Sequence, residues 1–317
     1  SKAFLLSRVP LLAAARPVHR VARSICSIPQ LLQQQAAANP DALALVSKHQ
    51  DVRYTYQELL QKSTALAAGF LSVGIAPGDV VLTWLPGCSE NVVAQLAAAF
   101  AGIQIATVKD AAGISALAEL QSAAMVSTMK DFFESKAAKP ATALVPPIVT
   151  GSDHVVGPFL KFEELLRPQP GFDASSIDVA FSAATPFVAR YNSVKGVSQD
   201  DLVQAGEAAA SELKLERSDI ICLPITLNHS FGFGSGILAA ISRGACVVIP
   251  SPSPEPELTM AALADEGCTL LYADTHTLTA LGQPAAGSLA RLRGGLVKIG
   301  SGDAFGAAEP REFAGVS

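Results

Sequence analysis

The sequence predicts an α/β protein with two subdomains, each built on a mostly parallel sheet that helices cover. One observation behind this is composition. Half of the 317 residues are hydrophobic and only 16% are charged, whereas disordered chains show the opposite balance. The other observation is the order of segments. Short apolar runs alternate with longer amphipathic runs, and strands that alternate with helices form parallel sheets. The length suffices for two domains.

The first half of the chain carries clear start and stop signals. Thr55, followed three residues later by Glu58, predicts a capped helix, and the Asn39-Pro40 step ends an earlier one. The elements expected here are a helix over 28–39, strands over 42–47 and 53–56, a helix to about residue 71, a strand over 80–84, a helix over 90–101 and a strand over 103–108. Gln95 and Gln104 interrupt the apolar run over 92–108, which therefore predicts a buried helix and strand rather than a membrane span.

The second half repeats the alternation after a proline-rich stretch. The elements expected here are a helix over 202–213, a strand over 220–224, a helix over 236–242, a strand over 245–249, a helix over 258–266 and a strand over 269–272. Prolines concentrate between residues 139 and 171 and predict a boundary. The predicted organisation is a basic extended arm over 1–27, a first α/β subdomain over 28–138, a Pro-rich linker over 139–173 and a second α/β subdomain over 174–317. No internal repeat is evident in the sequence.

The N-terminal segment and the cysteines bear on location. The first 40 residues hold five basic side chains and no carboxylate, with leucines between the charges, which resembles a mitochondrial transit peptide. The alternative is a basic arm on an ordinary soluble protein. The five cysteines are widely spaced and form no C-x-x-C pair. This pattern argues against a disulfide framework or a zinc site and favours free thiols in a reducing compartment.

Seven short motifs in a fixed order resemble the N-terminal half of the acyl-CoA synthetase and AMP-binding ligase family. They include the turn Pro77-Gly78-Asp79 and the tripeptide Lys195-Gly196-Val197. The seven motifs lie at 39–45, 54–59, 71–81, 91–102, 195–197, 223–245 and 292–313. The resemblance implies the N-terminal part of the adenylate-forming ligase fold.

One departure from the family concerns its phosphate-binding loop. The family has Ser-Gly-Thr-Thr-Gly where this chain has two alanines between Ser182 and Thr185 and then Pro186. Backbone N–H groups that wrap a phosphate favour glycine, and proline lacks the N–H. Residues 187–192 also displace Lys195 from this remnant. The family's Tyr-Gly-x-Thr-Glu motif, its ribose-binding aspartate and its C-terminal domain would lie beyond Ser317. We therefore expect a chain that is not an enzyme and has no catalytic residue, cofactor or metal.

The resemblance leaves a degenerate remnant of a binding site at Ser182, Thr185, Lys195 and His229. Lys195 is either a phosphate ligand or a solvated lysine before a helix, and the missing glycines favour the second interpretation. His229 matches a family histidine that lines the acyl tunnel, or is a packed remnant of the fold. The glycines at 232, 234 and 236 lack the spacing and the acidic residue of a dinucleotide fingerprint.

A hydrolase triad is a further candidate. Asp274 and His276 are two residues apart, and Ser230 follows His229. The chain has no G-x-S-x-G nucleophile elbow, so this arrangement is disfavoured.

The degenerate loop, the alanine-rich composition and the basic N-terminus together resemble the accessory, non-catalytic subunits of the mitochondrial ATP synthase of chlorophycean green algae. This implies a structural or assembly subunit of the peripheral stalk or dimer contact, on the matrix side of the inner mitochondrial membrane. Its partners would be other protein subunits of a large complex and a peripheral contact with the inner membrane, but no nucleic acid. The alternative is a truncated acyl-CoA synthetase-like enzyme, or a protein that binds an acyl group or a nucleotide.

Overall fold

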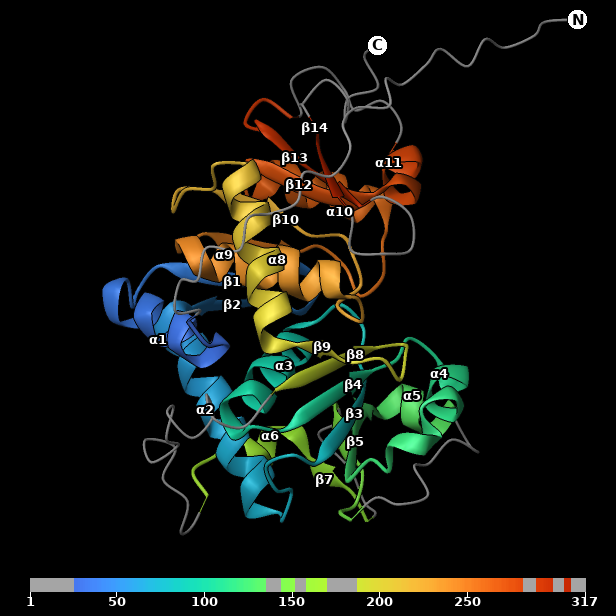
Figure 1. Ribbon diagram of the computed structural model, residues 1–317. Helices are drawn as coiled ribbons and strands as arrows, with labels where there is room; N and C mark the ends of the chain where they lie inside the picture. The colour runs from blue at the N-terminus through green and yellow to red at the C-terminus, as the bar shows by residue number, and fades with distance from the viewer. Residues whose placement is uncertain are drawn as a thin grey trace, which may run out of the picture.

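The computed structural model describes residues 26–134, 144–151, 158–169, 187–281, 289–298 and 305–308. Ser182, Thr185 and most of the predicted arm over 1–27 lie outside these residues. The described strands form two seven-stranded sheets, named here after their central strands (Figure 1). The strands of the β3 sheet, in spatial order, are β7 (Leu160–Lys161), β6 (Ile148–Thr150), β5 (Ala124–Thr128), β3 (Val80–Trp84), β4 (Gln104–Thr107), β8 (Val188–Tyr191) and β9 (Val197–Ser198). The strands of the β10 sheet are β14 (Phe305–Ala308), β13 (Gly294–Lys298), β12 (Leu270–Asp274), β10 (Ile220–Cys222), β11 (Cys246–Ile249), β1 (Leu43–Ser47) and β2 (Val52–Thr55).

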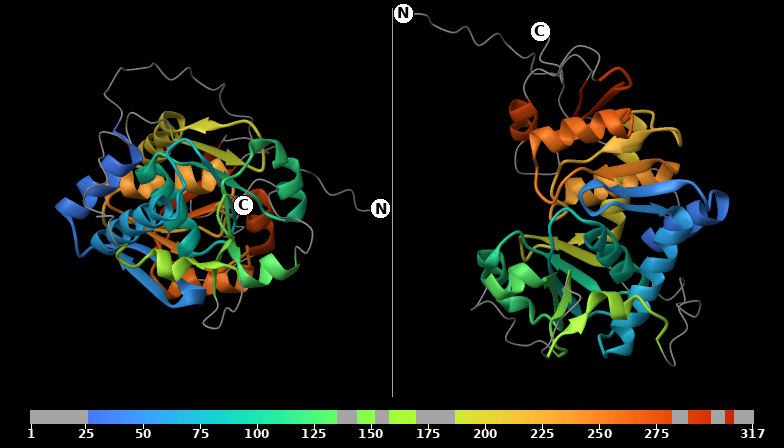
Figure 2. Two further views of the ribbon diagram at one scale, coloured as in Figure 1. Left: turned by 90° about the horizontal axis from the view of Figure 1, so that it is seen from below. Right: turned by 180° about the vertical axis from the view of Figure 1, so that it is seen from behind.

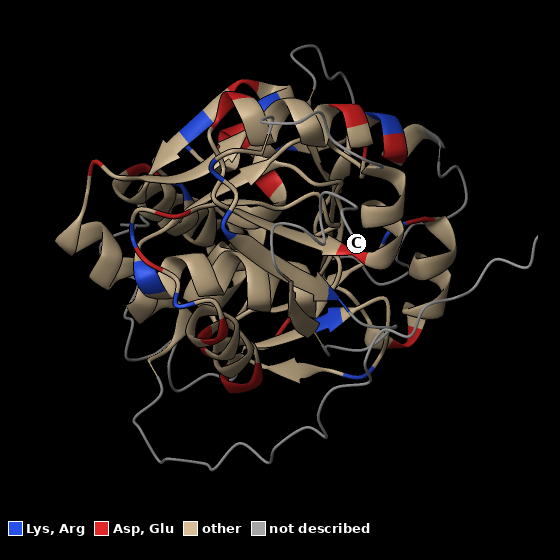
Figure 3. Ribbon diagram, turned by 90° about the horizontal axis from the view of Figure 1, so that it is seen from above, with Lys and Arg blue, Asp and Glu red and all other residues tan. Residues whose placement is uncertain are grey.

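Helices lie between the two sheets and on their outer faces, so the fold has five layers. The described α-helices are α1 (Ile28–Ala38), α2 (Tyr56–Ser72), α3 (Ser89–Ala101), α4 (Ala111–Ala116), α5 (Met129–Glu134), α6 (Phe162–Leu165), α8 (Gln199–Glu212), α9 (Ala239–Arg243), α10 (Pro256–Asp265) and α11 (Thr275–Leu281). A π-helix over Phe231–Leu238 precedes α9. The largest apolar cluster joins α2, α3, α8 and the π-helix to both sheets, while α10 and α4 each cover an outer face. Acidic and basic residues lie mostly on the peripheral ribbons (Figure 3). The predicted α/β fold class with mostly parallel sheets is confirmed.

The local signals explain where the helices begin. The Thr55 hydroxyl accepts a hydrogen bond from the Glu58 N–H, and the Glu58 carboxylate accepts one from the Thr55 N–H. The predicted capping box is therefore confirmed. Ser27 and Gln30 make the same reciprocal pair at the start of α1. Each box satisfies backbone donors that have no partner inside the helix.

The structure contains a repeat that the sequence does not reveal. Repeat 1, from α2 to β5, and repeat 2, from α8 to β12, each run helix, strand, helix, strand, helix, strand. In both, the central strand lies between the other two, with the order β5-β3-β4 or β12-β10-β11. In the turn before the central strand, Asp79 Oδ2 accepts a hydrogen bond from the Ala76 N–H at 2.7 Å. Asp219 Oδ2 accepts the equivalent bond from the Glu216 N–H at 2.8 Å.

The second turn of each repeat is also the same. Gly102 after α3 and Gly244 after α9 both have a left-handed φ, at 65° and 74°, which glycine adopts without strain. The next strand then begins with the same backbone hydrogen bond, from the Gln104 N–H to the Asp79 carbonyl and from the Cys246 N–H to the Asp219 carbonyl. Few side chains are needed for these turns, which explains why the sequence shows no repeat.

The two halves exchange their leading hairpins. The antiparallel pair β1–β2 comes just before repeat 1 but joins the β10 sheet, where Leu45 of β1 is in register with Val247 of β11. The pair β8–β9 comes just before repeat 2 but joins the β3 sheet, where Ala189 of β8 is in register with Ile105 of β4. The exchange is visible as blue strands in the upper sheet of Figure 1 and from behind in Figure 2.

The predicted chain division therefore differs from the division between sheets. Strands β1 and β2 fall in the predicted first subdomain, over 28–138, yet complete the β10 sheet. Strands β8 and β9 fall in the predicted second subdomain, over 174–317, yet complete the β3 sheet. Strands β6 and β7 of the β3 sheet lie inside the predicted linker over 139–173. Apolar runs predict that a strand is buried but not which sheet it joins.

Candidate functional site

The topology places a candidate site at the carboxyl ends of the central strands. From β3 the chain crosses to β4 on one side and then to β5 on the other, and from β10 it crosses to β11 and then to β12 in the same way. Open α/β sheets bind ligands where the chain reverses direction in this manner. The loops after β3 and β11 meet, because the Gly87 N–H donates to the Pro252 carbonyl at 2.8 Å.

A buried network of amides occupies this region. The Gln95 side chain, fully buried in α3, donates from Nε2 to Asn91 Oδ1 at 2.9 Å and to the Leu227 carbonyl at 3.1 Å. The Tyr191 hydroxyl at the end of β8 donates to Gln95 Oε1 at 3.2 Å. Asn91 Nδ2 in turn donates to the backbone of the loop after β3. Buried amides are tolerated only when they are hydrogen-bonded in this way. The network therefore holds the loop after β3, the end of β8 and the segment at Leu227 around α3.

A second asparagine extends the network between the sheets. Asn192 has a left-handed φ of 49°, which asparagine tolerates better than most residues. Its Nδ2 donates to the Asn228 carbonyl at 3.3 Å, and its Oδ1 accepts from the Lys109 N–H at 3.1 Å. The loops after β4, β8 and β10 therefore meet at one side chain.

A polar row lies at the ends of three neighbouring strands. Thr83, Thr107 and Tyr191 are in register across β3, β4 and β8. Thr83 is 1% exposed, and its hydroxyl has no hydrogen-bond partner among the described residues. A buried hydroxyl without a partner is unfavourable and marks a place where a bound polar group would be stabilised.

His229 lies next to this network, in the loop that follows β10. The side chain is half-buried, and its Nδ1 accepts a hydrogen bond from the Phe231 N–H at 3.1 Å. The neutral imidazole therefore carries its proton on Nε2. The π-helix that follows is fully buried, and such helices are frequent at functional sites. A Cβ at Gly232 would lie 2.7 Å from the Thr226 carbonyl oxygen, so the predicted glycine pattern here serves close packing.

The other predicted site residues are placed as follows. Lys195 is exposed between β8 and β9, where its N–H donates to Ser193 Oγ at 3.1 Å. No hydrogen bond within the described ranges joins its side chain to the network around His229. Asp274 Oδ1 accepts from the Thr277 N–H at 2.6 Å and so caps α11, whereas His276 is exposed. Ser182 and Thr185 lie outside the described residues.

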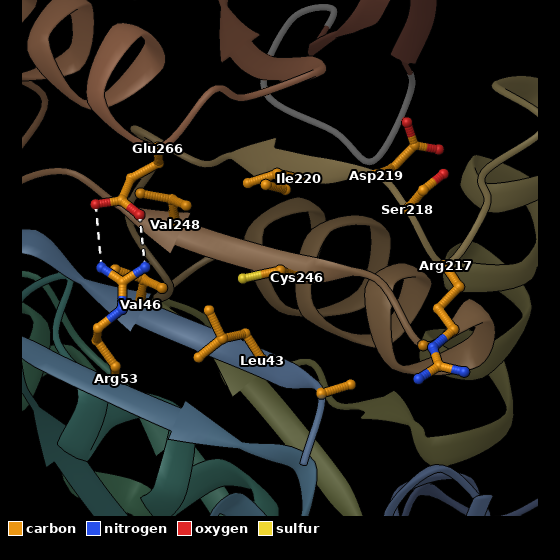
Figure 4. Close-up of a pocket in the computed structure, with 12 residues that line it drawn as sticks. Leu43, Val46, Arg53, Arg217, Ser218, Asp219, Ile220, Cys246, Val248 and Glu266 are labelled. Atoms are coloured by element: carbon orange, nitrogen blue, oxygen red, sulfur yellow. Dashed lines mark hydrogen bonds and ion pairs between the residues drawn. The ribbon is translucent and has the colours of Figure 1, made fainter. Parts of the chain in front are cut away.

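A separate cavity of about 250 Å³ lies at the opposite, amino ends of β10 and β11 (Figure 4). The ion pair between Arg53 and Glu266 borders it, and Arg217 points away from that pair. Burial raises the pKa of the Cys246 thiol there to about 12. A thiol with such a pKa is protonated at neutral pH and is a poor nucleophile.

The sequence analysis does not predict the amide network, although it singles out one of its residues. In the sequence, Gln95 is a polar interruption of an apolar run, and a glutamine on an otherwise buried helix is itself a signal for a buried polar contact. The positions of Tyr191 and Asn192 depend on the exchanged hairpin and had no such signal. Within the described ranges, no group of three His, Cys, Asp or Glu side chains could hold a metal ion. The described helices include none that is long and apolar enough to span a bilayer.

Comparisons with known proteins agree with the predicted resemblance. Residues 32–174 match a family model described as AMP-binding enzyme. The chain is 26% identical over 297 residues to the acyl-CoA ligase SID4 of Ajellomyces capsulatus, covering 84% of this chain and 50% of that protein. It is 27% identical over 312 residues to the mitochondrial medium-chain acyl-CoA ligase ACSF2 of Danio rerio, covering 85% of this chain and 50% of the relative. The chain thus spans about half the length of the curated relatives it matches.

Solved structures show the same fold. A protein of Rhodopseudomonas palustris described as a long-chain-fatty-acid CoA ligase superposes with a TM-score of 0.74 at 23% identity, over 87% of this chain and 70% of the other. The N-terminal domain of FACL13 from Mycobacterium tuberculosis gives 0.70 at 20% identity, over 86% and 70%. These matches support the resemblance to the N-terminal half of the acyl-CoA synthetase family.

The prediction that the chain is not an enzyme is wrong. The family model and the relatives point to acyl-CoA ligases and synthetases, which are enzymes. The prediction relied on one loop, on the displacement of Lys195 by residues 187–192 and on motifs expected after Ser317. One loop tests one part of a site, whereas the alignment reflects most of the chain.

Proposed function

We propose that this chain is the N-terminal part of an acyl-CoA ligase, which activates a carboxylic acid with ATP and transfers the acyl group to coenzyme A. The observation that carries the proposal is the position of the amide network and His229, at the carboxyl ends of β3, β8 and β10, in a chain whose relatives are named acyl-CoA ligases.

The chemistry of the region suits an apolar acid. The segment after His229 is apolar, and Phe231 lies with its ring centroid 6.2 Å from that of Tyr272. Small-molecule sites commonly combine apolar walls with a few fixed polar groups that orient the ligand. Here the polar groups are the Nε2–H of His229, the Thr83 hydroxyl and the amides of the network. Hydrogen-bond partners hold the amides and His229 in place before any ligand binds, which lowers the entropic cost of binding.

The test is acid-dependent exchange of pyrophosphate into ATP by the full-length product of the gene that encodes this chain. Fatty acids of increasing length serve as substrates, with no acid as the blank. We expect exchange that depends on the acid and that falls at least about tenfold in His229→Ala, as for the loss of one oriented polar contact. The matched control is His276→Ala, an exposed histidine on α11. Exchange that needs no acid, or equal activity in both variants, would contradict the proposal.

The relatives also bear on location. ACSF2 of Danio rerio, Bos taurus and Rattus norvegicus is named as mitochondrial. Together with the basic N-terminal segment, this supports a mitochondrial location for this protein, which import of the tagged full-length product into isolated mitochondria would test. The relatives lend no support to a subunit of ATP synthase. The predicted partner subunits and the contact with the inner membrane stay predictions.

A further inference from the structure

A cavity of about 320 Å³ lies where α2, α3 and α6 meet. It shares no lining residue with the network around Gln95 and His229. Its apolar lining is formed by Val93, Phe162 and Leu166, of which Val93 and Phe162 are buried. Four charged side chains also line it, two acidic and two basic.

The acidic groups of this cavity are fixed in place. Glu90 Oε2 accepts hydrogen bonds from Gln50 Nε2 at 2.7 Å and from Ser89 Oγ at 3.1 Å. Glu163 Oε1 accepts one from Thr150 Oγ1 at 2.7 Å. The same hydroxyl lies 3.5 Å from Glu90 Oε1, but a hydroxyl donates a single proton. Both hydrogen bonds to Glu163, from Thr150 and from the Gly151 N–H, reach Oε1, so its Oε2 is left without a hydrogen bond from the described residues.

The basic groups are Lys62 of α2 and Arg167 just after α6. The Lys62 ammonium lies 5.1 Å from the centroid of the Tyr54 ring, within the range of a cation–π contact. The described part of the chain gives the Arg167 guanidinium no hydrogen-bond partner. No ion pair joins Lys62 or Arg167 to Glu90 or Glu163 within the described ranges. Opposite charges thus line one cavity without neutralising each other.

We propose that this cavity binds a small zwitterion, a molecule with an ammonium group and an acid group on a short apolar body. The ammonium would lie against Glu90 and Glu163, the acid group against Lys62 and Arg167, and the apolar body against Val93, Phe162 and Leu166. Such a ligand supplies both missing counter-charges at once. An anion or a cation alone leaves one pair of charges uncompensated.

The size of the cavity agrees with this class of ligand. About 320 Å³ is at the lower end of the range for small-molecule sites, so a molecule of the size of an amino acid with an apolar side chain fits. A charged group that meets a preorganised opposite charge gains a stronger hydrogen bond than a neutral one. The hydrogen bonds from Gln50 and Thr150 supply that preorganisation.

Isothermal titration calorimetry on the protein tests the proposal, with L-leucine, 5-aminopentanoate and phosphoethanolamine as probes at millimolar concentration. The controls are 4-methylpentanoate and 3-methylbutylamine, which resemble leucine without its ammonium or without its carboxylate. We expect at least one zwitterion to bind, and both single-charge analogues to bind about tenfold more weakly or not at all. Because the readout is binding, the result is independent of any ligase activity.

A matched pair of variants locates the site. Glu163→Gln removes a lining charge, whereas Glu164→Gln changes the next residue of α6, which is exposed like Glu163 but does not line the cavity. We expect Glu163→Gln to weaken binding about tenfold and Glu164→Gln to leave it unchanged. The proposal is overturned if none of the probes binds, if a single-charge analogue binds as well as its zwitterion, or if the two variants bind equally.

Discussion

Repeat 1 and repeat 2 share their turns but differ in the helix that follows the central strand. In repeat 1 this helix, α3, is a regular α-helix from Ser89 to Ala101. In repeat 2 the same place holds a π-helix from Phe231 to Leu238 that continues into α9. Both helices carry residues of the candidate site, Gln95 in one and the backbone partner of His229 in the other. The comparison teaches that the turns keep the framework, while the segments that face the site are free to diverge.

The aspartates of the two equivalent turns also differ in what surrounds them. Each accepts a hydrogen bond from the backbone N–H three residues earlier. Asp219 in addition accepts from Arg293 Nη2 at 2.6 Å, Arg293 Nε at 2.8 Å and Thr269 Oγ1 at 2.7 Å. Asp219 is 4% exposed, whereas Asp79 is half-buried. The same turn is thus reinforced in one half only.

The largest expected effect is a difference between these two aspartates. We expect Asp219→Ala to lower the free energy of unfolding by about 2–3 kcal/mol, because several hydrogen bonds to a charged group are lost at once. Asp79→Ala should cost about 1 kcal/mol, the value of one hydrogen bond. Urea unfolding followed by circular dichroism measures both. Equal losses would show that the extra bonds of Asp219 add nothing.

Two buried tyrosines offer the next contrast. Tyr56 of α2 donates its hydroxyl to the Ala245 carbonyl at 2.7 Å, which ties repeat 1 to the turn after α9 in repeat 2. The Tyr272 hydroxyl is buried and has no partner among the described residues. We expect Tyr56→Phe to cost about 1–2 kcal/mol and Tyr272→Phe to be neutral or slightly stabilising, because it removes an unsatisfied group. The same urea titrations compare them, and a loss in Tyr272→Phe would reveal a partner for that hydroxyl.

Acid should lower the free energy of unfolding by less than these substitutions do, because it changes only the charge of the Asp219 carboxylate. Burial alone would raise the pKa of the Asp219 carboxyl, but hydrogen bonds from Arg293, the Glu216 N–H and Thr269 together hold it below its ordinary value. The unfolded chain then takes up the proton first as the pH falls. The stabilisation is present above the ordinary carboxyl pKa near 3.8 and is lost as the pH drops through the lower pKa of the folded state.

We therefore expect the difference in stability between the native protein and Asp219→Asn to be constant from pH 7 to about pH 5 and to shrink below about pH 4. Urea midpoints measured across this range provide the test. A difference that stays constant down to the acid limit of folding would mean that the pKa is not lowered.

The smallest effect is expected at the edge of the β10 sheet. Arg53 Nη2 lies 2.8 Å from Glu266 Oε2, but its side chain is 48% exposed. Exposed ion pairs contribute little, since solvent and salt screen them. Arg53→Gln should lower the stability by less than about 1 kcal/mol, with a smaller loss at high salt. A loss as large as that of Asp219→Ala would contradict the ranking.

Local signals predicted the framework of this fold well. The Thr55–Glu58 pair predicted the start of α2, and the run over 80–84 coincides with β3. The sequence predicts an ordinary helix only from residue 236, so residues 231–235 of the π-helix have no predicted counterpart. Helix periodicity does not distinguish the two forms over so few turns. What could not be predicted depends on contacts distant in sequence. Tyr191 reaches Gln95 only because β8 joins the sheet of the other half.

The exchange of hairpins has a consequence for how the chain folds during synthesis. Strand β1 needs β11, and about 200 residues separate Leu45 from its partner Val247. At a translation rate of about 5–20 residues per second, β1 leaves the ribosome roughly 10–40 s before β11. Throughout that interval the β1–β2 hairpin has no sheet to join, and closing so long a loop is slow. The nascent chain therefore exposes an apolar hairpin that a chaperone could bind. All strands of the β3 sheet have been made by Ser198, whereas the β10 sheet waits for β14 at 305–308.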